Sequence, residues 1–81
     1  MSNISESDVF AVIEKALEIK LGLLTENTRA EEIDNWDSLG QLSILVALDK
    51  LFDGKIASIS DISEADSISK IVSILKEHTL I

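Results

Sequence analysis

The stretch from Ile33 to Leu42, IDNWDSLGQL, places a serine, Ser38, where an acidic loop meets a long apolar helix. A hydroxyl at this junction is expected to be exposed and to lie in the positive field of the helix N-terminus. That field stabilises an anion, and backbone N–H groups of the first turn can bind phosphate oxygens. The position therefore suits a serine that carries a phosphate ester.

Helix capping is the competing interpretation of the same residues. Ser38 and Gln41 before an apolar run have the spacing of a capping box, and Asp37 could cap the helix instead. A short Asp-Ser-Leu sequence recurs by chance, so only its context can distinguish a modified serine from a helix cap. Here the serine follows a long loop, opens the second helix and lies just before the middle of an acidic, Cys-free chain of 81 residues.

The Asp37-Ser38-Leu39 sequence and this layout, over residues 5–78, resemble those of discrete acyl carrier proteins. The resemblance implies that Ser38 carries 4′-phosphopantetheine, attached by a separate phosphopantetheinyl transferase that uses coenzyme A and Mg²⁺. The thiol of this arm would hold an acyl or aminoacyl group as a thioester. Such a protein is a carrier and not an enzyme, and it is served by a loading ligase or synthase and by downstream transferases.

The same resemblance implies roles for residues near Ser38. Asp37 belongs to the motif that the transferase recognises, and Leu39 matches a leucine that partners grip. Val46 falls on the same helical face, seven residues on. Asp49 is the acidic residue of this helix after the serine and is included among the partner-facing positions. For Leu39 and Val46, burial in the core is an equally good interpretation.

Two departures from the fatty-acid type of carrier point to a specialised pathway. Gly40, Gln41 and Ser43 stand where acidic or polar residues are common, so electrostatic docking on this helix should be weaker. Gly40 costs about 1 kcal/mol of helix propensity relative to Ala. Its missing side chain either lets a partner approach the base of the arm or reflects drift at a surface position.

We therefore expect a carrier of acyl intermediates in a specialised fatty acid, lipid or polyketide pathway. Two alternatives remain open at this point. One is an aminoacyl carrier for surface-polymer or peptide biosynthesis, although the chain lacks the Gly-Gly-His/Asp-Ser form common in peptidyl carriers. The other is a helical interaction domain without an arm, in which the apolar second helix docks a partner and Ser38 stays unmodified.

Apolar periodicity predicts the elements that position these residues. A first helix begins near Ser5 or Ser7, buries one face while Glu14 lies mostly off it, and stops near Gly22. Residues 23–37 form a long connection whose Leu23, Leu24, Ile33 and Trp36 pack back onto the bundle. The second helix runs from Asp37 or Ser38 to about Phe52. Of its apolar residues, Ile44, Leu45 and Leu48 are expected in the core.

The remaining segments complete an all-α fold. Residues 55–60 are predicted to be an extended link and residues 61–65 a short helical turn. Asp66-Ser67 caps a last helix that buries Ile68, Ile71, Val72 and Leu75. The result is one domain over residues 1–81: a small four-helix bundle of three main helices and one short helix, with the long loop between the first two helices.

Composition excludes several other functions. A net charge of −8 with seven Lys and Arg residues disfavours binding to nucleic acid and to anionic membranes. A role of this charge in solubility alone is the competing explanation. No Cys and a single His argue against a metal site and against a Ser-His-Asp set. The longest apolar stretch, Ile44 to Leu48, is too short to span a bilayer, and no secretory signal is visible. A cytoplasmic monomer is expected.

Overall fold

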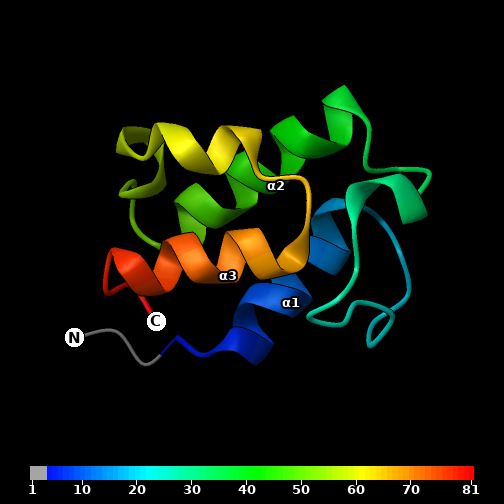
Figure 1. The fold of residues 1–81 in the computed structure, drawn as a ribbon, viewed down its shortest axis with the longest axis horizontal. Coiled ribbons are helices and arrows are strands. Elements are labelled where there is room, and N and C mark those ends of the chain that lie inside the picture. Colours follow the sequence, from blue (N-terminus) through cyan, green and yellow to red (C-terminus); the bar gives the residue numbers. More distant parts are fainter. Residues whose placement is uncertain (1–3) are drawn as a thin grey trace.

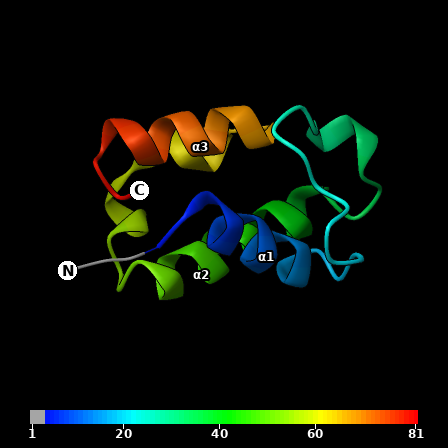
Figure 2. The same cartoon turned by 90° about the horizontal axis from the view of Figure 1, so that it is seen from below.

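The computed structural model describes residues 4–81 and consists of helices and 3₁₀ turns (Figure 1). The three α-helices are α1 (Glu6–Ala16), α2 (Ser38–Leu51) and α3 (Ile68–Glu77). Three 3₁₀ turns lie between them: η1 (Ala30–Glu32), η2 (Ile56–Ser58) and η3 (Ser60–Glu64). Figure 2 shows α1 and α2 side by side with α3 packed across from them. The predicted small all-α domain with a long connection between α1 and α2 is confirmed.

The α1 helix begins where the sequence predicts but ends earlier. Ser5 is its N-cap and forms a capping box with Asp8, since the Ser5 N–H donates to Asp8 Oδ2 at 3.0 Å. The helix ends at Ala16, well before Gly22, because Glu18 takes a left-handed backbone conformation with φ of 56°. Gly22, with φ of 88°, instead turns the chain in the following loop.

Glu14 is buried, which corrects the expectation that it lies off the packed face. Its side chain is only 3% exposed, and its carboxylate accepts hydrogen bonds from the backbone N–H groups of Gly22 and Leu24 at 2.9 and 3.0 Å. A buried carboxylate is stable when backbone donors bind it. Glu14 therefore holds the first part of the long connection against α1.

The connection between α1 and α2 is also tied to α3. The Ala30 N–H donates to the Asp66 carbonyl at 2.7 Å, and the Ile68 N–H donates to the Thr28 carbonyl at 2.9 Å. These bonds form an isolated antiparallel bridge at the beginning of α3. Leu24 and Trp36 are buried as predicted, whereas Leu23 is exposed. The loop thus has a defined path over the bundle.

The segment from residue 56 to residue 64 consists mostly of 3₁₀ turns and is not an extended link. The predicted extended link over residues 55–60 is wrong, because η2 and the beginning of η3 occupy most of it. Ile56, Ile59 and Ile62 recur every third residue, and all three are buried. Ile56 lies in η2, Ile62 lies in η3, and Ile59 is the extended residue that joins the two 3₁₀ turns. The short turn predicted at residues 61–65 corresponds to η3.

The beginning of α3 and its buried face agree with the prediction. Ser67 is the N-cap, and its Oγ accepts from the Lys70 N–H at 3.2 Å. Ile68, Ile71, Val72 and Leu75 all lie in the core with Ile44 and Leu48 of α2. No helix within residues 4–81 is long and apolar enough to cross a membrane.

Candidate functional site at Ser38

Asp37, and not Ser38, caps the N-terminus of α2. The Asp37 carboxylate accepts a hydrogen bond from the Gly40 N–H at 2.9 Å, and the Asp37 carbonyl accepts from the Gln41 N–H at 2.8 Å. Ser38 is the first residue of the helix and is exposed. Of the two caps that the sequence allows, Asp37 is the one formed, and Ser38 and Gln41 form no capping box.

The Ser38 hydroxyl is left available for chemistry. Within residues 4–81 it takes part in no hydrogen bond, and the N–H groups of Ser38 and Leu39 also lack an acceptor. Unsatisfied N–H groups at a helix N-terminus attract an anion. His78 follows α3, whose end lies at the opposite end of the molecule from the beginning of α2 (Figure 1). The hydroxyl accordingly has no imidazole beside it to act as a base.

Gly40 is required by the path of the loop, which corrects both interpretations of this residue. It is buried, and a Cβ atom built on it would overlap the Asn35 carbonyl oxygen and lie 3.1 Å from Leu17 Cδ2. Asn35 is fixed there because its side-chain Nδ2 donates to the Leu17 carbonyl at 2.9 Å. Gly40 therefore lets the loop lie directly against α2 and so determines where Ser38 is presented.

Gln41 ties three segments together beside Ser38. Its Oε1 accepts from the Trp36 indole N–H at 2.6 Å. Its Nε2 donates to the carbonyl oxygens of Ile62 and Ser63 at 3.3 and 3.1 Å. Trp36 is buried and anchors the end of the loop, as the sequence predicts. The loop, the first turn of α2 and η3 are thus connected around one amide.

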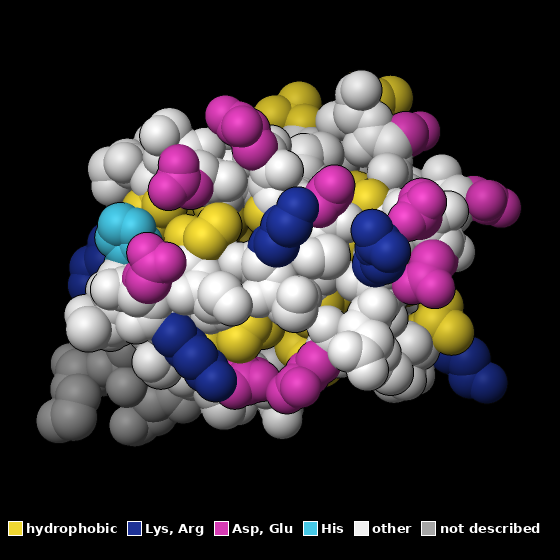
Figure 3. Space-filling view, viewed as in Figure 1, with side chains coloured by type: hydrophobic (Ala, Val, Ile, Leu, Met, Phe, Trp, Pro, Cys, Tyr) yellow, Lys and Arg dark blue, Asp and Glu magenta, His cyan; other side chains and the backbone are white. Residues whose placement is uncertain are grey.

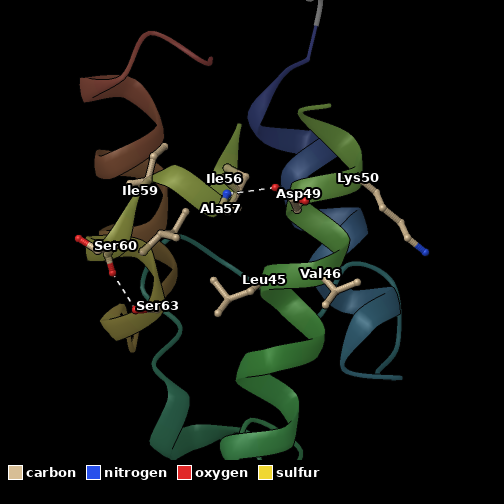
Figure 4. A pocket seen from close by; sticks show the side chains of 10 residues that line it. Leu45, Val46, Asp49, Lys50, Ile56, Ala57, Ile59, Ser60 and Ser63 are labelled. Carbon is tan, nitrogen blue, oxygen red and sulfur yellow. Dashed lines mark hydrogen bonds between the residues drawn. The ribbon is translucent and has the colours of Figure 1, made fainter. Parts of the chain in front are cut away.

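Two hollows flank this Gln41 bridge. One lies at Ser38 itself, measures about 400 Å³ and is lined among others by Trp36, Ser38, Gln41 and Ser63. The other also measures about 400 Å³ and lies between α2 and the η2–η3 segment (Figure 4). We call this second hollow the η groove; its apolar lining comes from Leu45, Val46, Ile56, Ala57, Ile59 and Ile62. Ser63 borders both hollows.

Leu39 and Val46 are exposed, so the core interpretation of these residues does not hold. Leu39 is 75% exposed and Val46 49%, and Leu42, which the sequence does not single out, is 57% exposed. We call these three residues the α2 stripe. Asp49 is half-buried, and its Oδ1 accepts from the Ala57 N–H at 3.1 Å. Its carboxylate thereby attaches η2 to α2 at one end of the η groove.

An ion pair lies at the edge of the hollow around Ser38. Lys70 Nζ lies 2.8 Å from Asp66 Oδ1 and donates a hydrogen bond to it. This hydrogen bond and the positive charge of Lys70 lower the pKa of the Asp66 carboxyl below its ordinary value. Residues 4–81 contain no group of three or more His, Cys, Asp or Glu side chains that could hold a metal ion.

Sequence reasoning missed the residues that fix the loop before α2. Asn35, Gln41 and Glu14 each form hydrogen bonds to backbone atoms of other segments, and such bonds depend on how distant segments meet. Gly40 was the one visible signal, since a glycine in the first turn of a helix opposes helix formation and calls for a reason. Comparison of the chain with protein-family models, with curated proteins and with solved structures finds no match.

Proposed function

We propose that this chain is an acyl carrier protein whose Ser38 holds a 4′-phosphopantetheine arm. The observation that carries the proposal is the free hydroxyl of Ser38 at the beginning of α2, with its capping role taken over by Asp37. The side-chain oxygen of a serine that served only as a helix cap would accept a hydrogen bond from a backbone N–H. Here the oxygen is exposed and unpaired among the described residues.

The residues around Ser38 fit the group. A phosphodiester on Oγ would lie next to the two first-turn N–H groups that lack an acceptor, and the helix N-terminus would stabilise its negative charge. Attachment joins Ser38 Oγ to the β-phosphorus of coenzyme A and releases adenosine 3′,5′-bisphosphate. The hydroxyl proton passes to the transferase, since this chain offers no imidazole there. When bound, the arm supplies the thiol that carries the acyl group.

The η groove supports a carrier of apolar acyl chains. Leu45 lies seven residues after Ser38, which is about 10 Å along the helix axis, so a group tethered at Ser38 can reach the groove. Its lining is mainly aliphatic, and Figure 4 shows Leu45 facing the η2–η3 segment across it. The aminoacyl alternative shares the Ser38 chemistry, and only assays with candidate loading ligases separate the two.

In this proposal Asp37, Leu39, Val46 and Asp49 face the transferase and the partner enzymes. Leu39 is adjacent to the arm and strongly exposed, so it is the apolar contact nearest the reacting group. The α2 stripe also favours the second candidate function, an interaction domain without an arm. That function requires the same exposed leucines but makes no use of the Ser38 hydroxyl.

Intact mass measurement after incubation with coenzyme A, Mg²⁺ and a broad-specificity phosphopantetheinyl transferase tests the proposal. We expect a gain of one phosphopantetheine group on the wild type and none on Ser38→Ala. The matched control is Ser43→Ala, which removes another exposed hydroxyl of the same helix and should leave labelling unchanged. Absence of labelling in a folded sample, beside a known carrier that is labelled, would leave the interaction domain as the function.

A further inference from the structure

A second groove lies between α1 and α2 and is lined by these two helices alone. It measures about 580 Å³ and is formed by Val12, Lys15, Ala16, Leu42, Ser43, Val46, Ala47 and Lys50. We call it the α1–α2 groove. Figure 4 shows Lys50 extending away from the η2–η3 segment, on the other side of α2 from Leu45. The two grooves share Val46 and Lys50 on α2, but α1 forms the other wall of this groove and the η2–η3 segment forms the other wall of the η groove.

The charge of the α1–α2 groove is opposite to that of the molecule. Its lining includes two lysines and no Asp or Glu, although the chain contains 15 acidic residues. Figure 3 shows acidic side chains spread over the face that carries α3. Arg29, Lys70 and Lys76 form ion pairs with carboxylates, whereas Lys15 and Lys50 form none within residues 4–81.

The apolar part of the groove is continuous with the surface beside Ser38. Leu42 and Val46 belong to the α2 stripe, and Leu39 extends the stripe to the residue after the serine. Leu42, Val46 and Lys50 recur every fourth residue and so form one row along α2. Large exposed aliphatic side chains in a row next to a groove are a feature of docking surfaces.

We infer that the α1–α2 groove binds an amphipathic helix of a partner protein that carries carboxylates beside its apolar face. A trough between two packed helices accepts a third helix, whose side chains at i, i+3, i+4 and i+7 fill it. Carboxylates on that helix would pair with Lys15 and Lys50. That the partner acts on the arm at Ser38 rests on the proposed carrier function, but the binding itself requires no arm.

The net charge of the whole chain and the charge of the groove predict different binding partners. A molecule with a net charge of −8 attracts cations and repels anions at long range. Net charge alone therefore predicts that a basic amphipathic helix binds better than an acidic one. The groove predicts the reverse, because its rim carries only positive charge.

Two synthetic helical peptides distinguish these expectations. Both carry leucines on one face, and the leucines are flanked by glutamates in one peptide and by lysines in the other. Each is titrated into the full-length, unmodified protein labelled with nitrogen-15. We expect the glutamate peptide to bind more tightly, to shift the amide signals of Val12, Leu42 and Ala47, and to weaken as salt is raised.

Charge reversal in the groove provides the decisive variant. The Lys15→Glu/Lys50→Glu protein should bind the glutamate peptide about tenfold more weakly, since each rim pair contributes a modest amount. The Lys20→Glu/Lys55→Glu protein is the matched control, because it undergoes the same change in net charge outside the groove and its lysines form no ion pair among the described residues. It should bind as the wild type does, apart from a small general repulsion.

Each of the following results would overturn the inference: a tighter complex with the lysine peptide, signal shifts confined to other surfaces, or equal weakening by both double variants. Concentration-dependent shifts of the groove signals without peptide would also overturn it, by making a second copy of the chain the occupant. Because no arm is present, failure to label Ser38 leaves this test unaffected.

Discussion

Single residues around Ser38 matter mainly because they leave the Ser38 hydroxyl free of any structural role. Asp37 takes the capping role, Gly40 withholds a side chain, and Asn35 fills the space that results. The serine oxygen consequently has no structural duty. A change to alanine can therefore have a large effect on stability at one position and a small effect a few residues away.

Gly40→Ala should destabilise the protein even though alanine is the better helix former. The gain in helix propensity is about 1 kcal/mol, whereas forcing a Cβ atom against the Asn35 carbonyl costs roughly 2–3 kcal/mol. We expect the free energy of unfolding in urea to fall by about 1–2 kcal/mol. Ser43→Ala, on the exposed side of the same helix, should change it by less than about 0.5 kcal/mol. A Gly40→Ala protein as stable as the wild type would contradict this account.

Lys70→Ala should raise the pKa of Asp66, because it removes the hydrogen bond and the charge that lower it. Because the pKa of Asp66 is lowered in the folded state, its ion pair with Lys70 stabilises the fold at pH values above the pKa of Asp66 in the unfolded chain. That stabilisation is lost as the pH falls through the lower, folded value. A carbon-13 titration of the Asp66 carboxyl measures the change. Lys76→Ala, which breaks the distant pair with Glu6, should leave this titration as it is in the wild type.

At the scale of elements, the long connection between α1 and α2 is an ordered part of the site. Glu14 holds its beginning, the bridge to α3 holds its middle, and Trp36 with Gln41 holds its end. A connection of this length without such anchors would leave the first turn of α2 without a fixed neighbour. The loop thus places Ser38 as much as α2 does.

Glu14→Ala should loosen the beginning of this connection. It removes a buried carboxylate and leaves the Leu24 N–H, in a buried residue, without an acceptor. We expect a loss of about 2–3 kcal/mol in the free energy of unfolding. Amide hydrogen exchange should accelerate at Leu24 more than in α3. Glu77→Ala removes an exposed acid at the end of α3 and serves as control, and an equal loss in both variants would contradict the role of Glu14.

At the scale of the whole molecule, carboxylates far outnumber cationic side chains. The chain has 15 acidic and seven basic residues, and the three ion pairs within residues 4–81 involve exposed or half-exposed side chains. Exposed ion pairs contribute little, so repulsion among the excess carboxylates dominates the surface electrostatics. The α1–α2 groove is the local exception to this pattern.

Added sodium chloride should therefore stabilise the protein. Raising the salt from low ionic strength to physiological strength shortens the Debye length to about 8 Å and screens the repulsion. We expect the melting temperature to rise by about 4 °C, which corresponds to about 1 kcal/mol for a domain of this size. Replacing the exposed acids Glu26, Asp34 and Glu64 by their amides should reduce the response to salt. A melting temperature that falls with salt would show that attractive pairs dominate.

The sequence by itself determined the class of fold, the three helices and the position of Ser38 at the beginning of the second one. These features follow from local rules: apolar side chains at helical spacing, cap residues before each helix and acidic residues between them. Ile68, Ile71, Val72 and Leu75 were predicted in the core for this reason and lie there. Local rules fail where two local solutions are equally good, as with Asp37 and Ser38 as caps.

Only the tertiary structure decided several other features, because the atoms that decide them come from separate segments of the chain. The 3₁₀ turns over residues 56–64 form because isoleucines at three-residue spacing meet a common core. Glu14 is buried because two loop N–H groups need an acceptor, and Gly40 is required because Asn35 lies against it. The two grooves on either side of α2 likewise depend on how the packed segments leave space between them.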